Sequence, residues 1–147
     1  MMPIGDWKQP DNTETYGIQI VHEPDDTNPK DRLGIKKPST WVIPASAILH
    51  LGMAMRNGAI KYGAFNWREK KVKASIYYDA MQRHATAWMA GEEYDQVSKV
   101  HHLGHLMACA AILIDAETTG NLIDDRPQND AILDLLAALT EQIEREE

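Results

Sequence analysis

The chain has 147 residues, of which 44% are hydrophobic and 25% charged, and its formal net charge is -7 at pH 7. A chain of this length forms one domain with a single small core, so we expect one globular domain that gains stability from self-association. The acid excess argues against nucleic acid as a partner, because neutralising phosphates requires a basic face. A nucleotide ligand is still compatible with this charge, since divalent cations offset both protein carboxylates and substrate phosphates.

The sequence also argues against a disulfide-bonded or membrane-spanning protein. Cys109 is the only cysteine, and its alanine-rich apolar surroundings predict a buried thiol. The N-terminus has no apolar signal core, and no segment approaches the roughly 18 apolar residues that a membrane span requires. We therefore expect a soluble cytoplasmic protein without a membrane partner.

Residues 1–40 are predicted to form an extended N-terminal arm. Five prolines stand among many polar residues in this stretch, and the residue before a proline favours extended backbone. Within the arm, residues 17–23 alternate weakly between apolar and polar side chains, which is compatible with a short strand or a docking segment.

Residues 41–147 are predicted to hold a helical domain. Ser39 or Thr40 followed by Pro44 marks a helix start, and apolar residues at helical spacing carry the first helix over about 44–61. A second apolar stripe begins at Ile76 and predicts a helix that stops at Gly91.

Two more helices complete the expected domain. The third spans about 98–119, is apolar on more than one face as in a central helix, and closes at Gly120. Asn129 is a suitable cap for a fourth helix with a regular apolar stripe. The predicted fold class is all-α, a four-helix bundle in which the second and third helices form an antiparallel hairpin.

The predicted hairpin brings together two groups of metal-competent side chains. Carboxylates are the ligands that Mg²⁺ prefers, whereas imidazoles more often bind Mn²⁺, Fe²⁺ or Zn²⁺. The imidazoles can instead orient a metal ligand or act as a general base for water. The alternative is a solvated acidic turn at a helix end. The two groups are the acids Glu92, Glu93 and Asp95 and the histidines His101, His102 and His105.

The segment GAIKYGAFNWR, residues 58–68, is a candidate nucleotide-recognition loop. Lys61 and Arg68 could bind phosphates, beside Asn66 and an aromatic surface on Trp67 for a base. The alternative is a tight interhelical turn in which the tryptophan fills the core. On the second helix, His84 could touch substrate or be a hydrogen-bonded core residue.

Four blocks of sequence resemble a known family. These blocks, NPKDRLGIKKPSTWVIP, GAIKYGAFNWRE, RHATAWMAGEE and HHLGHLMACAAILIDAETTGNLIDDRP, cover residues 28–127 and resemble the phage-associated dATP/dGTP diphosphohydrolases in order and spacing. That family is similar in reaction to the MazG-like all-α nucleoside triphosphate pyrophosphohydrolases. The resemblance implies metal-assisted attack of water that splits a deoxynucleoside triphosphate into monophosphate and pyrophosphate. In some phages, the dGMP so formed feeds synthesis of 2-aminoadenine nucleotides.

The resemblance also implies roles for individual residues. It favours Glu92 and its neighbours as metal ligands, and the 58–68 loop with Arg83 and His84 as the nucleotide site. One departure stands out: the MazG-like pattern has ExxE on one helix and ExxD on the next, whereas here an acidic cluster faces an HxxH.

The resulting hypothesis is a metal-dependent purine deoxynucleoside triphosphate pyrophosphohydrolase, a homodimer or homotetramer, in the host cytoplasm if phage-encoded. One alternative is a phosphohydrolase with a different cleavage position, and another is a non-catalytic acidic helical module that binds a protein. The predicted cofactor is Mg²⁺ or Mn²⁺. The predicted ligands are Glu92, Glu93 and Asp95, the catalytic candidates His102, His105 and Glu93, and the substrate-binding candidates Lys61, Asn66, Trp67, Arg68, Arg83 and His84.

Overall fold

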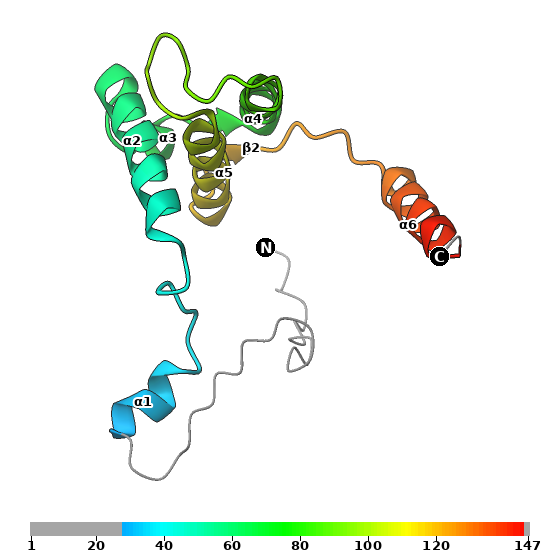
Figure 1. The fold of residues 1–147 in the computed structure, drawn as a ribbon, viewed down its shortest axis with the longest axis horizontal. Coiled ribbons are helices and arrows are strands. Elements are labelled where there is room, and N and C mark those ends of the chain that lie inside the picture. The colour runs from blue at the N-terminus through cyan, green and yellow to red at the C-terminus, as the bar shows by residue number, and fades with distance from the viewer. Residues whose placement is uncertain (1–27, 146–147) are drawn as a thin grey trace. The chain divides into compact units, whose positions relative to one another are not determined.

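The computed structural model describes residues 28–145 and is mostly helical, which confirms the predicted all-α class (Figure 1). The chain divides into two compact units, Met1–Val42 and Ile43–Glu147. In the first unit, helix α1 (Pro29–Gly34) begins where the Asn28 side chain accepts a hydrogen bond from the Lys30 backbone N–H. The described part of the expected extended arm therefore contains a short helix, while the predicted segment 17–23 lies outside the described residues.

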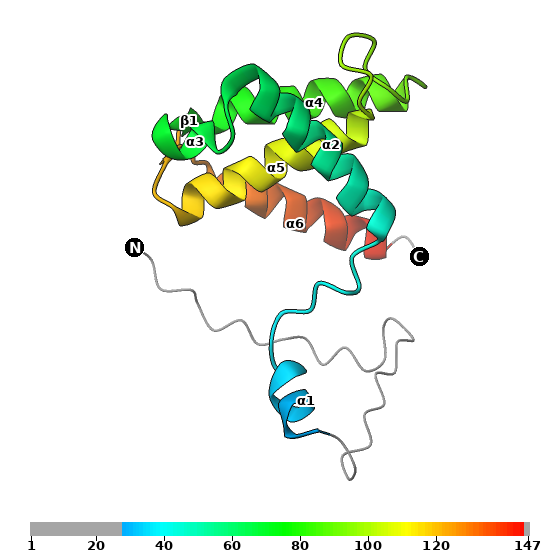
Figure 2. The same ribbon diagram turned by 90° about the vertical axis from the view of Figure 1, so that its left-hand side faces the viewer.

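Three helices pack together in the second unit. Helix α5 (His102–Thr118) contacts both α2 (Ala45–Tyr62) and α4 (Ala74–Met89). Helices α4 and α5 run antiparallel, as the predicted hairpin requires (Figure 2). Helix α5 begins later than the predicted position 98, because the His101 side chain accepts from the Leu103 N–H and caps the helix there.

A short helix and a two-stranded sheet lie where α4 begins and α5 ends. Helix α3 (Asn66–Glu69) follows α2 after a short turn, and strands β1 (Val72–Lys73) and β2 (Leu122–Ile123) pair in parallel. The sequence did not predict the two strands, since two residues cannot display the alternation that marks a strand.

Small side chains make up much of the core between the helices, together with one buried tryptophan. Ala54, Val100 and Ala108 form one buried cluster, and a second cluster contains Trp67 and the fully buried Ala116. Small residues allow α2 and α5 to approach closely, because short side chains take up little space between the two backbones.

Helix α5 approaches the backbone of α2 closely at Gly104. A Cβ atom built at this position would lie 2.6 Å from the carbonyl oxygen of His50. By contrast, a Cβ atom at Gly52 on α2 would have no neighbour within 4 Å. Glycine at position 104 is therefore a packing requirement, whereas glycine at position 52 is not.

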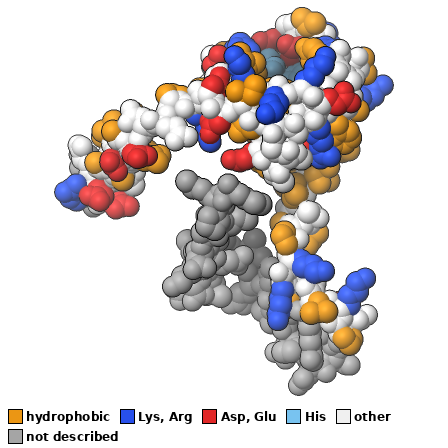
Figure 3. Space-filling model, turned by 180° about the vertical axis from the view of Figure 1, so that it is seen from behind, with side chains coloured by type: hydrophobic (Ala, Val, Ile, Leu, Met, Phe, Trp, Pro, Cys, Tyr) orange, Lys and Arg blue, Asp and Glu red, His pale blue; other side chains and the backbone are white. Residues whose placement is uncertain are grey.

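Helix α6 (Asp130–Glu144) begins at the predicted cap, where the Asn129 side chain accepts from the Ala131 N–H. Every residue of α6 is exposed, so its apolar stripe is not part of the core that α2, α4 and α5 form. Hydrophobic side chains are visible at the surface beside charged ones (Figure 3). Those on α6 are Ile132, Leu133, Leu135, Leu136, Leu139 and Ile143.

Among the described residues, no helix combines the length and apolar character that crossing a membrane demands.

We expect Gly104→Ala to lower the free energy of unfolding by about 1–3 kcal/mol, because the added methyl group meets backbone that cannot move independently. Urea unfolding followed by circular dichroism measures this change. The matched control is Gly52→Ala, which should be neutral or stabilising by about 0.5–1 kcal/mol, since alanine is preferred inside a helix. A similar increase in the free energy of unfolding for both variants would show that α2 and α5 have room to separate.

Candidate active site

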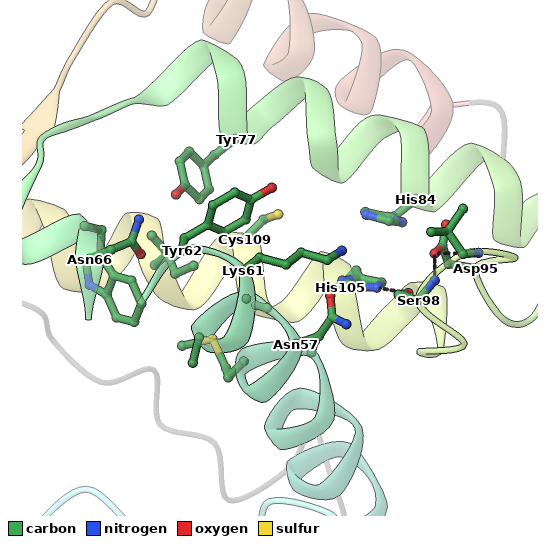
Figure 4. Close-up of a pocket in the computed structure, with 18 residues that line it drawn as sticks. Asn57, Lys61, Tyr62, Asn66, Tyr77, His84, Asp95, Ser98, His105 and Cys109 are labelled. Atoms are coloured by element: carbon green, nitrogen blue, oxygen red, sulfur yellow. Dashed lines mark hydrogen bonds between the residues drawn. The ribbon is translucent and has the colours of Figure 1, made fainter. Parts of the chain in front are cut away.

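A cavity of about 420 Å³ lies between α2, α4 and α5 and the loop that joins the last two helices (Figure 4). This size is within the range of small-molecule sites. One end is polar and contains His84, Asp95 and His105, while Tyr62 and Tyr77 lie at the opposite end. The cavity therefore offers two chemically different environments to one elongated ligand.

Asp95 is fixed as a carboxylate at the polar end by the turn that follows it. Its Oδ1 atom accepts from the backbone N–H groups of Val97 and Ser98, at 3.2 and 2.6 Å. The hydrogen bond from the Ser98 backbone is the main cause that lowers the pKa of Asp95 to about 2. Asp95 is therefore negatively charged throughout the neutral pH range.

Two imidazoles at this end are stacked and neutral. The rings of His84 and His105 lie 4.6 Å apart and nearly parallel, and His105 Nε2 is 2.8 Å from the hydroxyl of Ser98. Burial is the main cause that lowers the pKa of each imidazole; the Asp95 carboxylate opposes both shifts, and Lys61 adds to the lowering of the His105 pKa. Both side chains are thus able to accept a proton at neutral pH.

A third imidazole, that of His102, contacts the His84 ring and is 4% exposed. The Nδ1 atoms of these two residues are 2.9 Å apart, so one of them must carry the proton that they share. The Nε2 atom of His102 has no hydrogen-bond partner among the described residues, and the Glu92 carboxylate lies 3.5 Å from it. This carboxylate favours a proton on His102 Nε2, which leaves His84 Nδ1 as the donor and His84 Nε2 with a free lone pair.

Glu93 and His101 lie outside the cavity lining. Glu93 is exposed, with its Oε1 atom 3.8 Å from His101 Nε2, and the His101 ring contacts those of His50 and Tyr94. Within the described residues, no three His, Cys, Asp or Glu side chains converge well enough to hold a metal ion. Of the three predicted carboxylate ligands, Asp95 alone lines the cavity, so the three do not converge on one metal position in the described residues.

Asp115, on α5, binds two residues of α3 at the aromatic end of the cavity. Its Oδ2 atom accepts from Trp67 Nε1 at 2.6 Å and from Arg68 Nε at 2.8 Å, and its Oδ1 atom accepts from the second guanidinium nitrogen at 2.7 Å. The hydrogen bonds from Arg68 and then Trp67 lower the pKa of Asp115 to about 2. We call this arrangement, formed by Trp67, Arg68 and Asp115, the Asp115 clamp.

The predicted substrate-binding residues divide into two groups. Lys61, Asn66, Trp67 and His84 line the cavity, and Trp67 also fills the core, as the alternative for this loop proposed. The remaining two do not line it: the guanidinium of Arg68 is engaged by Asp115, and Arg83 lies on an exposed part of α4.

Sequence reasoning missed several lining residues. Asn57 stands one helical turn before Lys61 on α2, so helical spacing could have indicated it. Ser98 follows Asp95 by three residues, a spacing typical of a turn closed by a carboxylate. Tyr77 and the partly buried Cys109 carried no such local signal.

Comparison with protein families matches residues 27–126, most of the chain, to the N-terminal region of the dATP/dGTP diphosphohydrolases. The chain belongs to this family. The matched residues of this diphosphohydrolase include α2, α4 and α5 and all the residues that line the cavity. No curated protein and no solved structure gives a significant match.

Replacing Asp115 with Asn should lower the melting temperature at pH 7, because the amide cannot accept the charge-assisted pair of bonds from Arg68. The folded pKa of Asp115 lies below its ordinary value of about 3.9, so its contribution is present above that pH. The difference between variant and wild type should shrink as the pH falls from about 4 toward 2. Melting curves recorded across this pH range test both statements.

Asp124→Asn is the matched control for this experiment. Asp124 pairs with Arg126 in a similar two-pronged geometry, and its pKa is also lowered to about 2. These partners are two residues apart, so their interaction can persist in the unfolded chain and should add little to stability. An equal effect of the two substitutions would contradict a specific role for the Asp115 clamp.

Proposed function

We propose that this chain is a metal-dependent hydrolase that converts dGTP and dATP into the monophosphate and pyrophosphate. Membership of the dATP/dGTP diphosphohydrolase family supports the substrates. The observation that carries the proposal is the two-ended cavity, with a lysine and neutral imidazoles at one end and aromatic rings at the other. This combination suits a phosphate chain and a base held in one pocket.

The cavity residues suggest how the reaction proceeds. The Lys61 side chain extends along the cavity with its amine toward His84 and His105, where it would bind the triphosphate (Figure 4). A water oxygen would bond to the α-phosphorus as the bond to the pyrophosphate oxygen breaks. His84 or His105 would take the proton from that water, because both are neutral and line the cavity.

His102 would then act through His84. Its buried ring hydrogen-bonds to His84 and faces Glu92, so it would hold the His84 ring in the orientation and tautomer that a proton acceptor requires. In this scheme His102 and Glu92 are positioning residues, while Glu93 has no contact with the cavity.

Dependence on Mg²⁺ or Mn²⁺ is part of the proposal. A divalent cation neutralises phosphate charge and lowers the pKa of bound water. Proteins commonly hold Mg²⁺ through one or two carboxylates together with substrate phosphates. Asp95 is the carboxylate available in the cavity for this purpose, and Glu92 and Glu93 lie outside the lining.

We also propose a role in phage nucleotide metabolism, where the dGMP formed would feed synthesis of 2-aminoadenine nucleotides. The support for this role is the resemblance to phage-associated enzymes in the blocks of residues 28–127.

A direct assay tests the reaction. Purified protein is incubated with dGTP, dATP, GTP and dCTP in the presence of Mg²⁺, Mn²⁺ or a chelator, and the products are resolved by chromatography. We expect dGMP and dAMP with one pyrophosphate each, lost on chelation. Triphosphate or free phosphate as the product would establish a different cleavage position, and full activity in chelator would contradict the metal requirement.

The Lys61→Ala variant tests whether the reaction takes place in this cavity. Loss of a hydrogen bond to a charged group costs about 1.5–3 kcal/mol, so kcat/KM should fall roughly 10- to 100-fold. Lys71→Ala is the control, because Lys71 is an exposed lysine that does not line the cavity. Equal kcat/KM values for the two variants would place the reaction elsewhere.

We further propose that the chain forms a homodimer or homotetramer. The exposed apolar residues of α6 support this, together with Ile48, Leu49 and Met53 on α2, because contiguous exposed apolar surface is typical of interaction sites. Light scattering coupled to size-exclusion chromatography should give two or four times the chain mass of 16.6 kDa. A mass of one chain at micromolar concentration would contradict the proposal.

A further inference from the structure

A free amide lies at the aromatic end of the cavity. Asn66 lines the cavity and is half-buried, and its side chain makes no hydrogen bond with any residue that the structure describes. It lies with Tyr62 and Tyr77 at the end opposite His84 (Figure 4). The amide is thus held where a stacked base would present its edge.

The backbone of Asn66 is fixed although its side chain is free. The next residue, Trp67, is 7% exposed and bonded to Asp115, and Arg68 is bound to the same carboxylate. The Asn66 carbonyl also accepts from the Lys70 N–H. A polar group on a rigid support loses little entropy when it binds a ligand, which makes it suitable for discriminating between ligands.

Adenine and guanine make opposite demands on such a group. Adenine has an amino group at position 6 that donates and an N1 atom that accepts. Guanine has a carbonyl group at position 6 that accepts and an N1–H that donates. A primary amide carries one acceptor and one donor group side by side, and a half-turn about its last bond exchanges them. Asparagine can therefore form two hydrogen bonds with either purine, whereas a tyrosine hydroxyl offers a single oxygen atom and not a donor and an acceptor side by side.

We propose that Asn66 is the residue that recognises the base, pairing with the Watson–Crick edge of adenine in one amide orientation and of guanine in the other. This inference rests on the proposed function and explains how one cavity accepts both substrates. A pyrimidine presents the same pairs of groups on a smaller ring, so its edge falls short of the amide when the phosphates are held at the polar end.

Asn66→Asp tests the inference, because a carboxylate has acceptors only. Guanine can donate to it from N1 and from the 2-amino group, whereas the N1 lone pair of adenine faces a negative charge. The ratio of kcat/KM for dGTP to that for dATP should rise roughly 10- to 100-fold, as expected for a discrimination of about 1–3 kcal/mol. An unchanged ratio would overturn the proposal.

Asn57→Asp is the matched control. It makes the same chemical change at the polar end, where Asn57 lies near His105 (Figure 4). This substitution can lower turnover of both purines, but it should leave their ratio unchanged. If both variants shift the ratio equally, the effect comes from added negative charge and not from base recognition, and the proposal fails.

Equilibrium binding of dGMP and dAMP separates this inference from the reaction. If the wild type hydrolyses neither triphosphate, the proposed function fails, yet a selective loss of dAMP binding in Asn66→Asp would still support base recognition. Should that variant not fold, Asn66→Ala replaces it. Loss of affinity for both monophosphates supports the proposal, and wild-type affinity for both overturns it.

Discussion

The carboxylate of Asp115 determines where the aromatic end of the cavity lies. A helix as short as α3 is not stable by itself, because forming one turn costs more conformational entropy than one or two backbone hydrogen bonds return. Three N–H donors from Trp67 and Arg68 converge on this single side chain of α5. The position of α3, and with it that of Asn66, thus depends on an ionised group near the end of the central helix.

Helix α5 organises both ends of the cavity. His105 belongs to its first turns, and Asp115 follows ten residues later on the same helix. At a rise of 1.5 Å per residue, these positions are about 15 Å apart along the axis. One rigid helix therefore holds the histidine end and the aromatic end of the cavity at a fixed separation, while Gly104 allows α2 to pack closely beside it.

The sequence predicted elements better than it predicted contacts. Periodicity located α2 and α4 to within about two residues, because burying one helix face imposes a regular apolar pattern. The hydrogen bond between Trp67 and Asp115 joins residues 48 positions apart, and no local pattern in the sequence indicates such a contact. The start of α5 was predicted too early for a related reason: the Asp95 turn and the left-handed backbone of Lys99 keep the preceding residues out of the helix. Proximity of acids and histidines was foreseen, but which of them line the cavity depends on side-chain directions.

The turn between α2 and α3 carries an uncommon backbone conformation at Phe65, whose φ is 57°. A non-glycine residue in this left-handed region costs about 1–2 kcal/mol, which the surroundings offset: the Phe65 ring contacts Trp67, and the Arg68 guanidinium lies 4.9 Å above it. This turn is the sole covalent link between Lys61 and Asn66, and both of its ends are anchored. Inserting or deleting one residue in this turn would therefore shift the Lys61 side chain relative to that of Asn66 along the cavity wall, so the length of the turn matters as much as the residues in it.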